Sequence, residues 1–260
     1  MIAKAFAANG AKVYITGRRL DVLKKAAASV TGVPGSIVPF RMDVTDEESV
    51  KAGAKYIEGI DGKLDILVNN SGIAGSRRDP DFAAKKYAAE TRDPFEPETV
   101  QNWEDIFALN TIAAFFVVRA FQSLLVKGAQ SRAQGTSSVI NISSVAAKLN
   151  GLSPATSVSY NVTKAALDKL TLVLATSFAG RSIPIRVNVL APGPFLSEMA
   201  THEQLEMIKN NTLPGLVAPV PAKRSGTEAE MGMTAIYLAV SDFTNGAVLN
   251  LDGGLSLVNP

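Results

Sequence analysis

Residues 138–144 read Ser-Val-Ile-Asn-Ile-Ser-Ser, a short apolar run that ends in two hydroxyl side chains. A run of this length that is rich in β-branched residues indicates a buried strand. A loop follows, and residues 157–179 then have the composition of a helix. A strand followed by a loop and a helix is the repeating unit of an α/β fold with a parallel sheet.

The same alternation continues on both sides of this unit. Further strands are expected at residues 12–16, 37–41, 64–68, 185–190 and 247–251, and further helices at residues 2–9, 20–30, 45–59, 99–127 and 227–240. Thr45 and Thr227 are expected to cap the helices at residues 45–59 and 227–240. This pattern predicts a doubly wound, Rossmann-like parallel sheet with helices on both faces. Surface excursions are expected at residues 73–98, with a short helix near 82–89, and at residues 194–224. No linker or repeat divides the chain, so residues 1–260 are predicted to form one domain.

Polar or glycine-containing segments follow most of the expected strands. They are Gly17-Arg18, Asp43, Asn70 to Gly72, Ser144 and Pro192-Gly193. In open α/β sheets, ligands bind outside the carboxyl ends of the strands. These segments are therefore expected to gather along one edge of the sheet and to form a binding site there.

Tyr160 and Lys164 are four residues apart and would share one face of a helix. Lowering a phenol pKa from about 10 to about 7 takes roughly 4 kcal/mol, and a lysine ammonium one turn away supplies part of it. Ser144 could hold a carbonyl oxygen beside the phenol. A tyrosine and a lysine at this spacing are also common on ordinary surface helices, so the pair alone does not define a site.

Composition narrows the classes of function. The chain has 260 residues, 47% of them hydrophobic, and a net charge of +2 that does not favour nucleic-acid binding. The absence of cysteine excludes disulfides and thiol catalysis, and the single histidine, His202, cannot build a metal site of several histidines. With no apolar run of about 18 residues, we expect no membrane span and a cytoplasmic location.

Several short motifs follow one another along the chain in the order of a known motif set. They are Asp43-Val44, Asn69 to Gly72, Asn110, Ser144, Tyr160 with Lys164, and Pro192-Gly193. In this respect the chain resembles the short-chain dehydrogenase/reductase family over essentially its whole length. Within the family it looks like the fungal members that are grouped with 3-oxoacyl reductases. The resemblance implies an NADP(H)-dependent enzyme that reduces a carbonyl to an alcohol, or the reverse.

The resemblance also implies catalytic roles. Tyr160 would be the general acid that protonates the carbonyl oxygen as hydride arrives from the nicotinamide. Lys164 would lower the pKa of Tyr160 and hold the nicotinamide ribose. Ser144 would position the substrate oxygen, with Ser143 as the other candidate, and Asn110 would hold a water that relays protons to Lys164.

Arg18 bears on the choice of cofactor. An acidic residue at the end of the second strand of this fold binds the ribose 2′-OH of NAD, and the matching position here is Gly17, followed by Arg18 and Arg19. A guanidinium pairs well with a 2′-phosphate, so NADP(H) is favoured, although a solvated turn is an alternative explanation. The other cofactor contacts implied by the resemblance are Asp43, Val44, Asn70, Gly72, Tyr160, Lys164, Pro192, Gly193, Phe195 and Ser197.

One family element is missing. The family pattern begins with a strand and a loop of the form Thr-Gly-x-x-x-Gly-x-Gly, and neither is found before residues 12–16. That strand normally lies between those at residues 12–16 and 64–68, so a gap of about twice the 4.8 Å strand spacing is expected. The loop supplies amides for the pyrophosphate. We hypothesise that this chain is an N-terminally incomplete copy of an active reductase.

Other functions stay open at this point. A catalytically silent binding or assembly subunit would explain the missing glycine loop, and isomerases or dehydratases use the same scaffold. Few charges lie near residues 149–158 and Phe195, which favours a neutral or apolar carbonyl substrate. The resemblance implies that residues 194–224 cover this substrate. The resemblance further implies a homodimer or homotetramer formed through the helices at residues 99–127 and 157–179.

Overall fold

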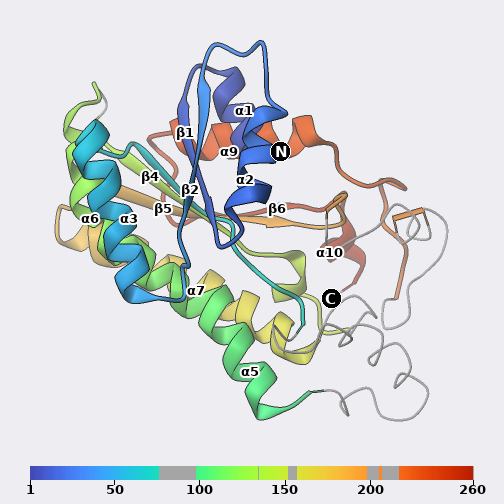
Figure 1. The fold of residues 1–260 in the computed structure, drawn as a ribbon. Coiled ribbons are helices and arrows are strands. Elements are labelled where there is room, and N and C mark those ends of the chain that lie inside the picture. Colours follow the sequence, from blue (N-terminus) through green and yellow to red (C-terminus); the bar gives the residue numbers. More distant parts are fainter. Residues whose placement is uncertain (76–97, 134, 152–156, 198–204, 207–216, 260) are drawn as a thin grey trace.

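The computed structural model describes residues 1–75, 98–133, 135–151, 157–197, 205–206 and 217–259 (Figure 1). The helix expected near residues 82–89 and most of the excursion at 194–224 lie outside these residues. The strands are β1 (Lys12–Gly17), β2 (Ser36–Arg41), β3 (Ile66–Asn69), β4 (Ser137–Ile142), β5 (Ile185–Pro192) and β6 (Val248–Leu251). The helices are α1 (Ile2–Ala8), α2 (Leu20–Ala28), α3 (Glu47–Asp61), α5 (Val100–Phe107), α6 (Ala113–Gln130), α7 (Val158–Gly180), α9 (Glu228–Val240) and α10 (Leu255–Val258).

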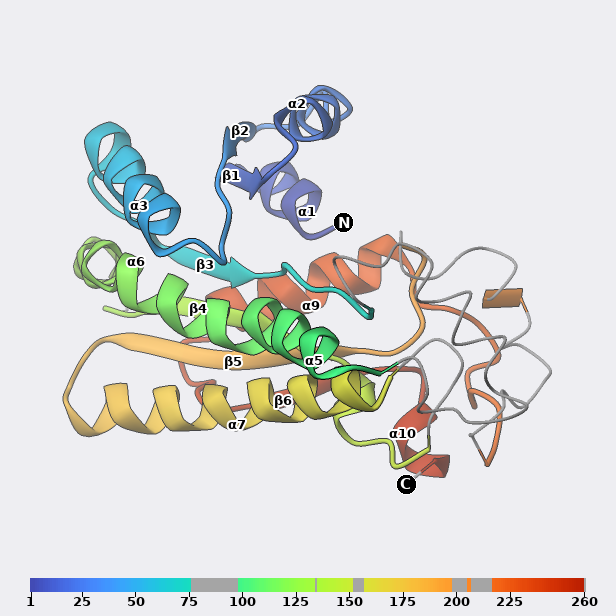
Figure 2. The ribbon, with the colours of Figure 1, turned by 60° about the horizontal axis from the view of Figure 1, so that its bottom comes forward.

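Every strand pair among these elements is parallel, as the alternating pattern predicted. α9 packs on β4 and β5 and also contacts α1, which with α2 packs on β1 and β2. α6 and α7 pack on the other face of the four-stranded part, with α3 against α6 (Figure 2). The predicted doubly wound α/β fold with helices on both faces is therefore confirmed.

The sheet is divided into two parts. β1 pairs with β2, and β3, β4, β5 and β6 form a separate four-stranded sheet. Figure 2 shows β1 and β2 standing apart from β3. Within the described residues, the gap expected between the strands at residues 12–16 and 64–68 is thus confirmed. Unpaired backbone groups along two interior strand edges cost about 1–3 kcal/mol each when they are buried.

Helix packing and a polar cluster hold β1 and β2 against the rest of the fold. α1 and α9 approach closely, because a Cβ added to Gly232 would lie 2.6 Å from the Cβ of Ala5. On the opposite face, Asp61 at the end of α3 accepts hydrogen bonds from Lys12 at 2.8 Å and from the Tyr14 hydroxyl at 2.5 Å. The position of the two-stranded part therefore depends on its helices and side chains.

The helix expected over residues 99–127 runs from Val100 to Gln130 and contains a π-helical turn, η1 (Ala108–Ile112), between α5 and α6. Contrary to the sequence-based expectation, this segment is long and apolar enough to cross a bilayer, with a mean hydropathy of 1.6. That is weak support for a membrane span, because α3, β3 and β4 pack against α6. A core helix has the same composition.

One predicted helix cap is wrong. Thr45 was expected to cap α3, but Asp46 is the capping residue and accepts two N–H groups of the first turn. Thr45 instead donates its N–H and its hydroxyl to the Asp43 carboxylate, at 3.0 and 2.7 Å. The predicted cap of α9 is confirmed, since Thr227 forms a capping box with Glu230.

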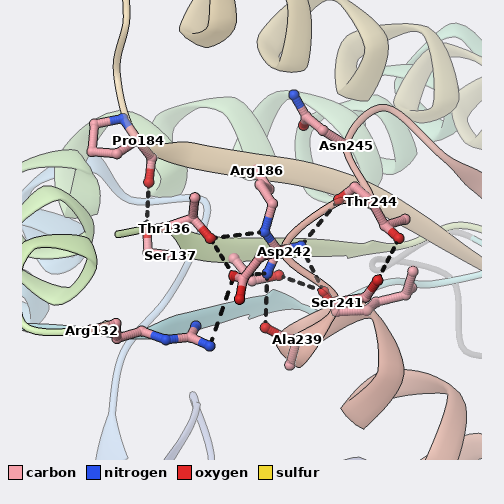
Figure 3. A network of polar contacts seen from close by, with 12 residues as sticks. Arg132, Thr136, Ser137, Pro184, Arg186, Ala239, Ser241, Asp242, Thr244 and Asn245 are labelled. Carbon is pink, nitrogen blue, oxygen red and sulfur yellow. Dashed lines mark hydrogen bonds and ion pairs between the residues drawn. The ribbon is translucent and has the colours of Figure 1, made fainter. Parts of the chain in front are cut away.

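A buried polar network lies at the amino ends of β4 and β5, away from the carboxyl ends of the strands (Figure 3). Arg186 of β5 is only 4% exposed. Its guanidinium donates to the carbonyl oxygens of Leu238, Ala239 and Thr244, at 3.0, 2.8 and 3.1 Å. The carboxylate of Asp242 lies 3.6 Å away and balances the charge. This arrangement fastens the end of α9 to the sheet.

Candidate active site

A cavity of about 1460 Å³ opens at the carboxyl ends of the strands. Its lining includes all the site residues predicted from the sequence: Arg18, Asp43, Val44, Asn70, Gly72, Asn110, Ser144, Tyr160, Lys164, Pro192, Gly193, Phe195 and Ser197. Val13 and Ile15 of β1 and Ile66 and Val68 of β3 also line it, so the cavity extends to the gap in the sheet. The predicted residues are brought together, while their roles stay predictions.

Tyr160 lies in the first turn of α7 and is 7% exposed. Burial raises the pKa of its phenol, and a hydrogen bond with the Ser144 side chain offsets part of that rise. Lys164 is not among the groups that shift this pKa here, so its expected lowering of the Tyr160 pKa stays a prediction. The Lys164 ammonium donates to the Ile142 carbonyl at 2.9 Å and lies 5.7 Å from the centre of the phenol ring. Desolvation is therefore the dominant effect on Tyr160.

The two adjacent serines have different partners. Ser144 faces Tyr160, and its hydroxyl also accepts the N–H of Ala146 at 3.2 Å. The buried hydroxyl of Ser143 donates to the Lys164 carbonyl at 3.1 Å. Successive residues of an extended chain point to opposite sides, which explains the difference. The geometry favours Ser144 over Ser143 as the serine beside a substrate oxygen.

Asn110 lies in the π-helical turn and joins three segments around the cavity. Its amide oxygen accepts the N–H of Ile73 at 2.9 Å, and its amide nitrogen donates to the carbonyl of Ile73 at 2.9 Å and to the Thr163 hydroxyl at 3.1 Å. Gly72 precedes this contact, and a Cβ there would lie 3.3 Å from the Asn110 oxygen and 3.4 Å from Lys164 Nζ. The water relay implied for Asn110 stays a prediction, because its side chain already binds protein groups.

The two ends of the cavity hold the other predicted residues. Arg18 is exposed just after β1. At the opposite end, a Cβ on Gly193 would lie 2.8 Å from the Cα of Asp252, so only glycine fits there. Phe195 is buried, with its ring directly over Gly226. His202 lies outside the described residues.

Asp168 was not identified from the sequence. It follows Lys164 by one turn of α7, and its Oδ1 is buried with no hydrogen-bond partner. Burial raises the pKa of the Asp168 carboxyl, while Ser143, Lys148 and Lys164 lower it. In turn, burial lowers the pKa of Lys164 from 10.5 to about 8, and the charge of Asp168 opposes this fall. The four-residue spacing from Lys164 was a signal that could have identified it.

We predict that Asp168→Asn lowers the pKa of Lys164 below its value of about 8. The substitution removes the negative charge that favours the ammonium form, so Lys164 loses its proton at a lower pH. The pH dependence of the Lys164 side-chain NMR resonance, assigned with Lys164→Met, measures the change. Glu104→Gln, at an exposed site on α5, is the control. An unchanged Lys164 titration in Asp168→Asn would disprove the coupling.

Glu98 was also missed. It lies just before α5, and its carboxylate accepts the N–H groups of Val158 and Ser159 at the start of α7, at 2.6 and 3.0 Å. Sixty residues separate these partners along the chain. No local pattern in the sequence could have predicted this contact.

Comparison with known proteins gives consistent matches. A family model described as enoyl-(acyl carrier protein) reductase matches residues 1–256. The chain is 34% identical over 274 residues to the short-chain dehydrogenase/reductase VdtF of Byssochlamys spectabilis, covering 98% of this chain and 87% of that protein. The NADP active-site complex of Pseudomonas aeruginosa RhlG matches with a TM-score of 0.79 and 27% identity, over 98% of this chain and 90% of that one.

A gluconate 5-dehydrogenase from Burkholderia cenocepacia, solved with NADP and tartrate, matches with a TM-score of 0.74 and 26% identity, over 98% of this chain and 89% of that one. The chain belongs to the short-chain dehydrogenase/reductase family, whose members are oxidoreductases with nicotinamide cofactors.

Proposed function

We propose that this chain is an NADP(H)-dependent oxidoreductase that reduces a carbonyl group to an alcohol, or catalyses the reverse reaction. The observation that carries the proposal is the convergence of Ser144, Tyr160 and Lys164 at one cavity, whose lining also includes Arg18. A phenol, a hydroxyl and a buried ammonium side by side suit proton transfer to an oxygen that gains negative charge.

Each catalytic side chain has a task in this reaction. The bound nicotinamide would supply the hydride to the carbonyl carbon. Tyr160 would donate its proton to the carbonyl oxygen, which Ser144 would hold by a hydrogen bond. Lys164, with a pKa of about 8, is mostly protonated at neutral pH and would stabilise the phenolate left on Tyr160.

The residues present fit two parts of a dinucleotide. Arg18 offers a guanidinium for a 2′-phosphate at the end of β1. At the other end of the cavity, Gly72 leaves open the space that a Cβ would fill beside Lys164. The pyrophosphate between them would lie toward the gap, and the described chain has no glycine-rich loop there. Cofactor affinity is therefore the property most sensitive to the divided sheet.

An apolar cluster supports a neutral or apolar carbonyl substrate. Val145, Val220 and Leu255 are buried together, with Leu149 packed against them, and all four line the cavity. A charged substrate placed against this cluster would lose hydration without gaining a partner.

A homo-oligomer formed through α6 and α7 is also proposed. Four apolar side chains on these helices are partly exposed. They are Ile112 at the end of η1 (50%), Phe115 of α6 (39%), and Leu172 (38%) and Val173 (52%) of α7. Apolar side chains of this size at the surface of two long helices favour burial against a second copy.

The first test is a fluorescence titration of the chain with NADPH and with NADH. We expect NADPH to bind more tightly, and Arg18→Ala to weaken NADPH binding by about 10- to 100-fold through the lost charge-assisted hydrogen bonds. Lys24→Ala, an exposed charge on α2 that does not line the cavity, is the control. Equal affinity for both cofactors in the wild type would contradict the assignment of Arg18.

The second arm of this test concerns the divided sheet. The open edges of β1 and β3 support the hypothesis of an incomplete copy, and they equally favour a catalytically silent binding subunit. Adding a strand and a glycine-rich loop from a relative before residue 1 should produce NADPH oxidation with a panel of neutral carbonyl compounds. If the completed chain binds NADPH but turns over none of them, the reductase proposal is wrong and the silent subunit is favoured.

A further inference from the structure

The start of α7 is held by a residue from a different part of the chain. The N–H groups of the first helical turn have no partner within the helix. At α7, the hydroxyl of Ser157 accepts the N–H of Tyr160 at 3.0 Å. The N–H groups of Val158 and Ser159 instead donate to the two carboxylate oxygens of Glu98, at 2.6 and 3.0 Å.

Glu98 directly precedes Thr99, the capping residue of α5, and α5 leads through η1 to Asn110. The two hydrogen bonds to the Glu98 carboxylate therefore fix the helix that carries Tyr160 relative to the helical segment that carries Asn110. A carboxylate at a helix N-terminus also interacts favourably with the helix dipole. The hydroxyl of Ser157 adds a contact of 3.4 Å to the Ala74 carbonyl in the segment after β3.

We propose that Glu98 is a positioning residue for the oxidoreductase reaction: its carboxylate fixes the first turn of α7, and thereby places the Tyr160 hydroxyl beside Ser144. This inference rests on the proposed function for its effect on turnover. Tyr160 is two residues from Val158 and one from Ser159, so movement of this turn displaces the phenol. Lys164 is one turn further on and is held separately by the Ile142 carbonyl.

The experiment compares Glu98→Ala and Glu98→Gln with Asp46→Ala. All three substitutions are made in the chain that has been completed with a strand and a glycine-rich loop, because turnover is measured with that chain. Asp46 makes the same kind of cap at the start of α3, with N–H bonds of 2.9 and 3.1 Å, so it is a matched control for lost stability. Both alanine variants should lose thermal stability by similar amounts. Only Glu98→Ala should lower kcat, on the order of 10- to 100-fold, with KM for the carbonyl compound within about twofold.

Glu98→Gln keeps one acceptor oxygen, so its kcat should fall between those of the wild type and Glu98→Ala. A kcat for Glu98→Ala within twofold of the wild type, or an equal loss in Asp46→Ala, would overturn the inference.

A spectroscopic measurement separates this inference from the proposed function. The Tyr160 ring resonance in ¹³C-tyrosine-labelled protein, assigned with Tyr160→Phe, should shift in Glu98→Ala and stay in place in Asp46→Ala. If the wild type shows no turnover at all, the reductase proposal fails, and this resonance still decides whether Glu98 positions Tyr160. An unmoved resonance in Glu98→Ala would overturn the positioning role.

Discussion

Replacing Tyr160 with phenylalanine is expected to abolish carbonyl reduction while the fold is retained. The substitution removes only the hydroxyl, and with it the proton for the carbonyl oxygen and the hydrogen bond with Ser144. General acid catalysis by a positioned side chain contributes about 10²- to 10⁴-fold, so kcat should fall by that factor. The loss should appear in steady-state NADPH oxidation with the strand-completed chain, at saturating cofactor.

Two comparisons make this result specific. Tyr237→Phe removes another tyrosine hydroxyl, from a side chain that is 50% exposed on α9, and should leave kcat unchanged. NADPH affinity should be similar in Tyr160→Phe and the wild type, because the ring and Lys164 remain. A Tyr160→Phe variant that keeps more than about a tenth of the wild-type kcat would rule out Tyr160 as the proton donor.

Replacing Arg186 with methionine is expected to cause the largest loss of stability among the substitutions considered. Without the guanidinium, the carbonyl oxygen of Ala239 loses its side-chain donor, that of Leu238 keeps only the Ser138 hydroxyl, and the Asp242 carboxylate loses a countercharge. Removing one partner of a buried ion pair costs about 3–5 kcal/mol. In a chain of this size, each kcal/mol lowers Tm by roughly 2–4 °C. Thermal and urea unfolding followed by circular dichroism would measure the change.

Arg181→Met is the matched control for this prediction. Arg181 is exposed at the end of α7, and its guanidinium donates to the Ser177 hydroxyl at 2.6 Å, so its loss should change stability by less than about 0.5 kcal/mol. Arg186→Lys keeps the charge but has a single nitrogen, and should be intermediate. If Arg186→Met does not fold, Arg186→Lys still provides the test. A Tm for Arg186→Lys equal to that of the wild type would contradict the prediction.

The order of strands and helices could be predicted because it depends on local patterns. Short apolar runs with β-branched residues gave β4 and β5, and the capping residue Thr227 gave the start of α9. The cap of α3 was assigned to Thr45 when Asp46 holds it, since adjacent residues with oxygen side chains compete for the same N–H groups. The π-helical turn could not be predicted, because it depends on the contacts of Asn110 with other segments.

Sequence patterns were enough to predict that the candidate site residues line one cavity, because parallel strands bring the residues that follow them to one edge of the sheet. They also predicted where the sheet is divided. The folded chain was needed to show that Ser144 rather than Ser143 faces Tyr160, and that burial raises the pKa of that phenol. Glu98 likewise reaches α7 only in the folded chain. Desolvation and hydrogen bonds between distant segments depend on separations in space, and local sequence patterns do not contain these separations.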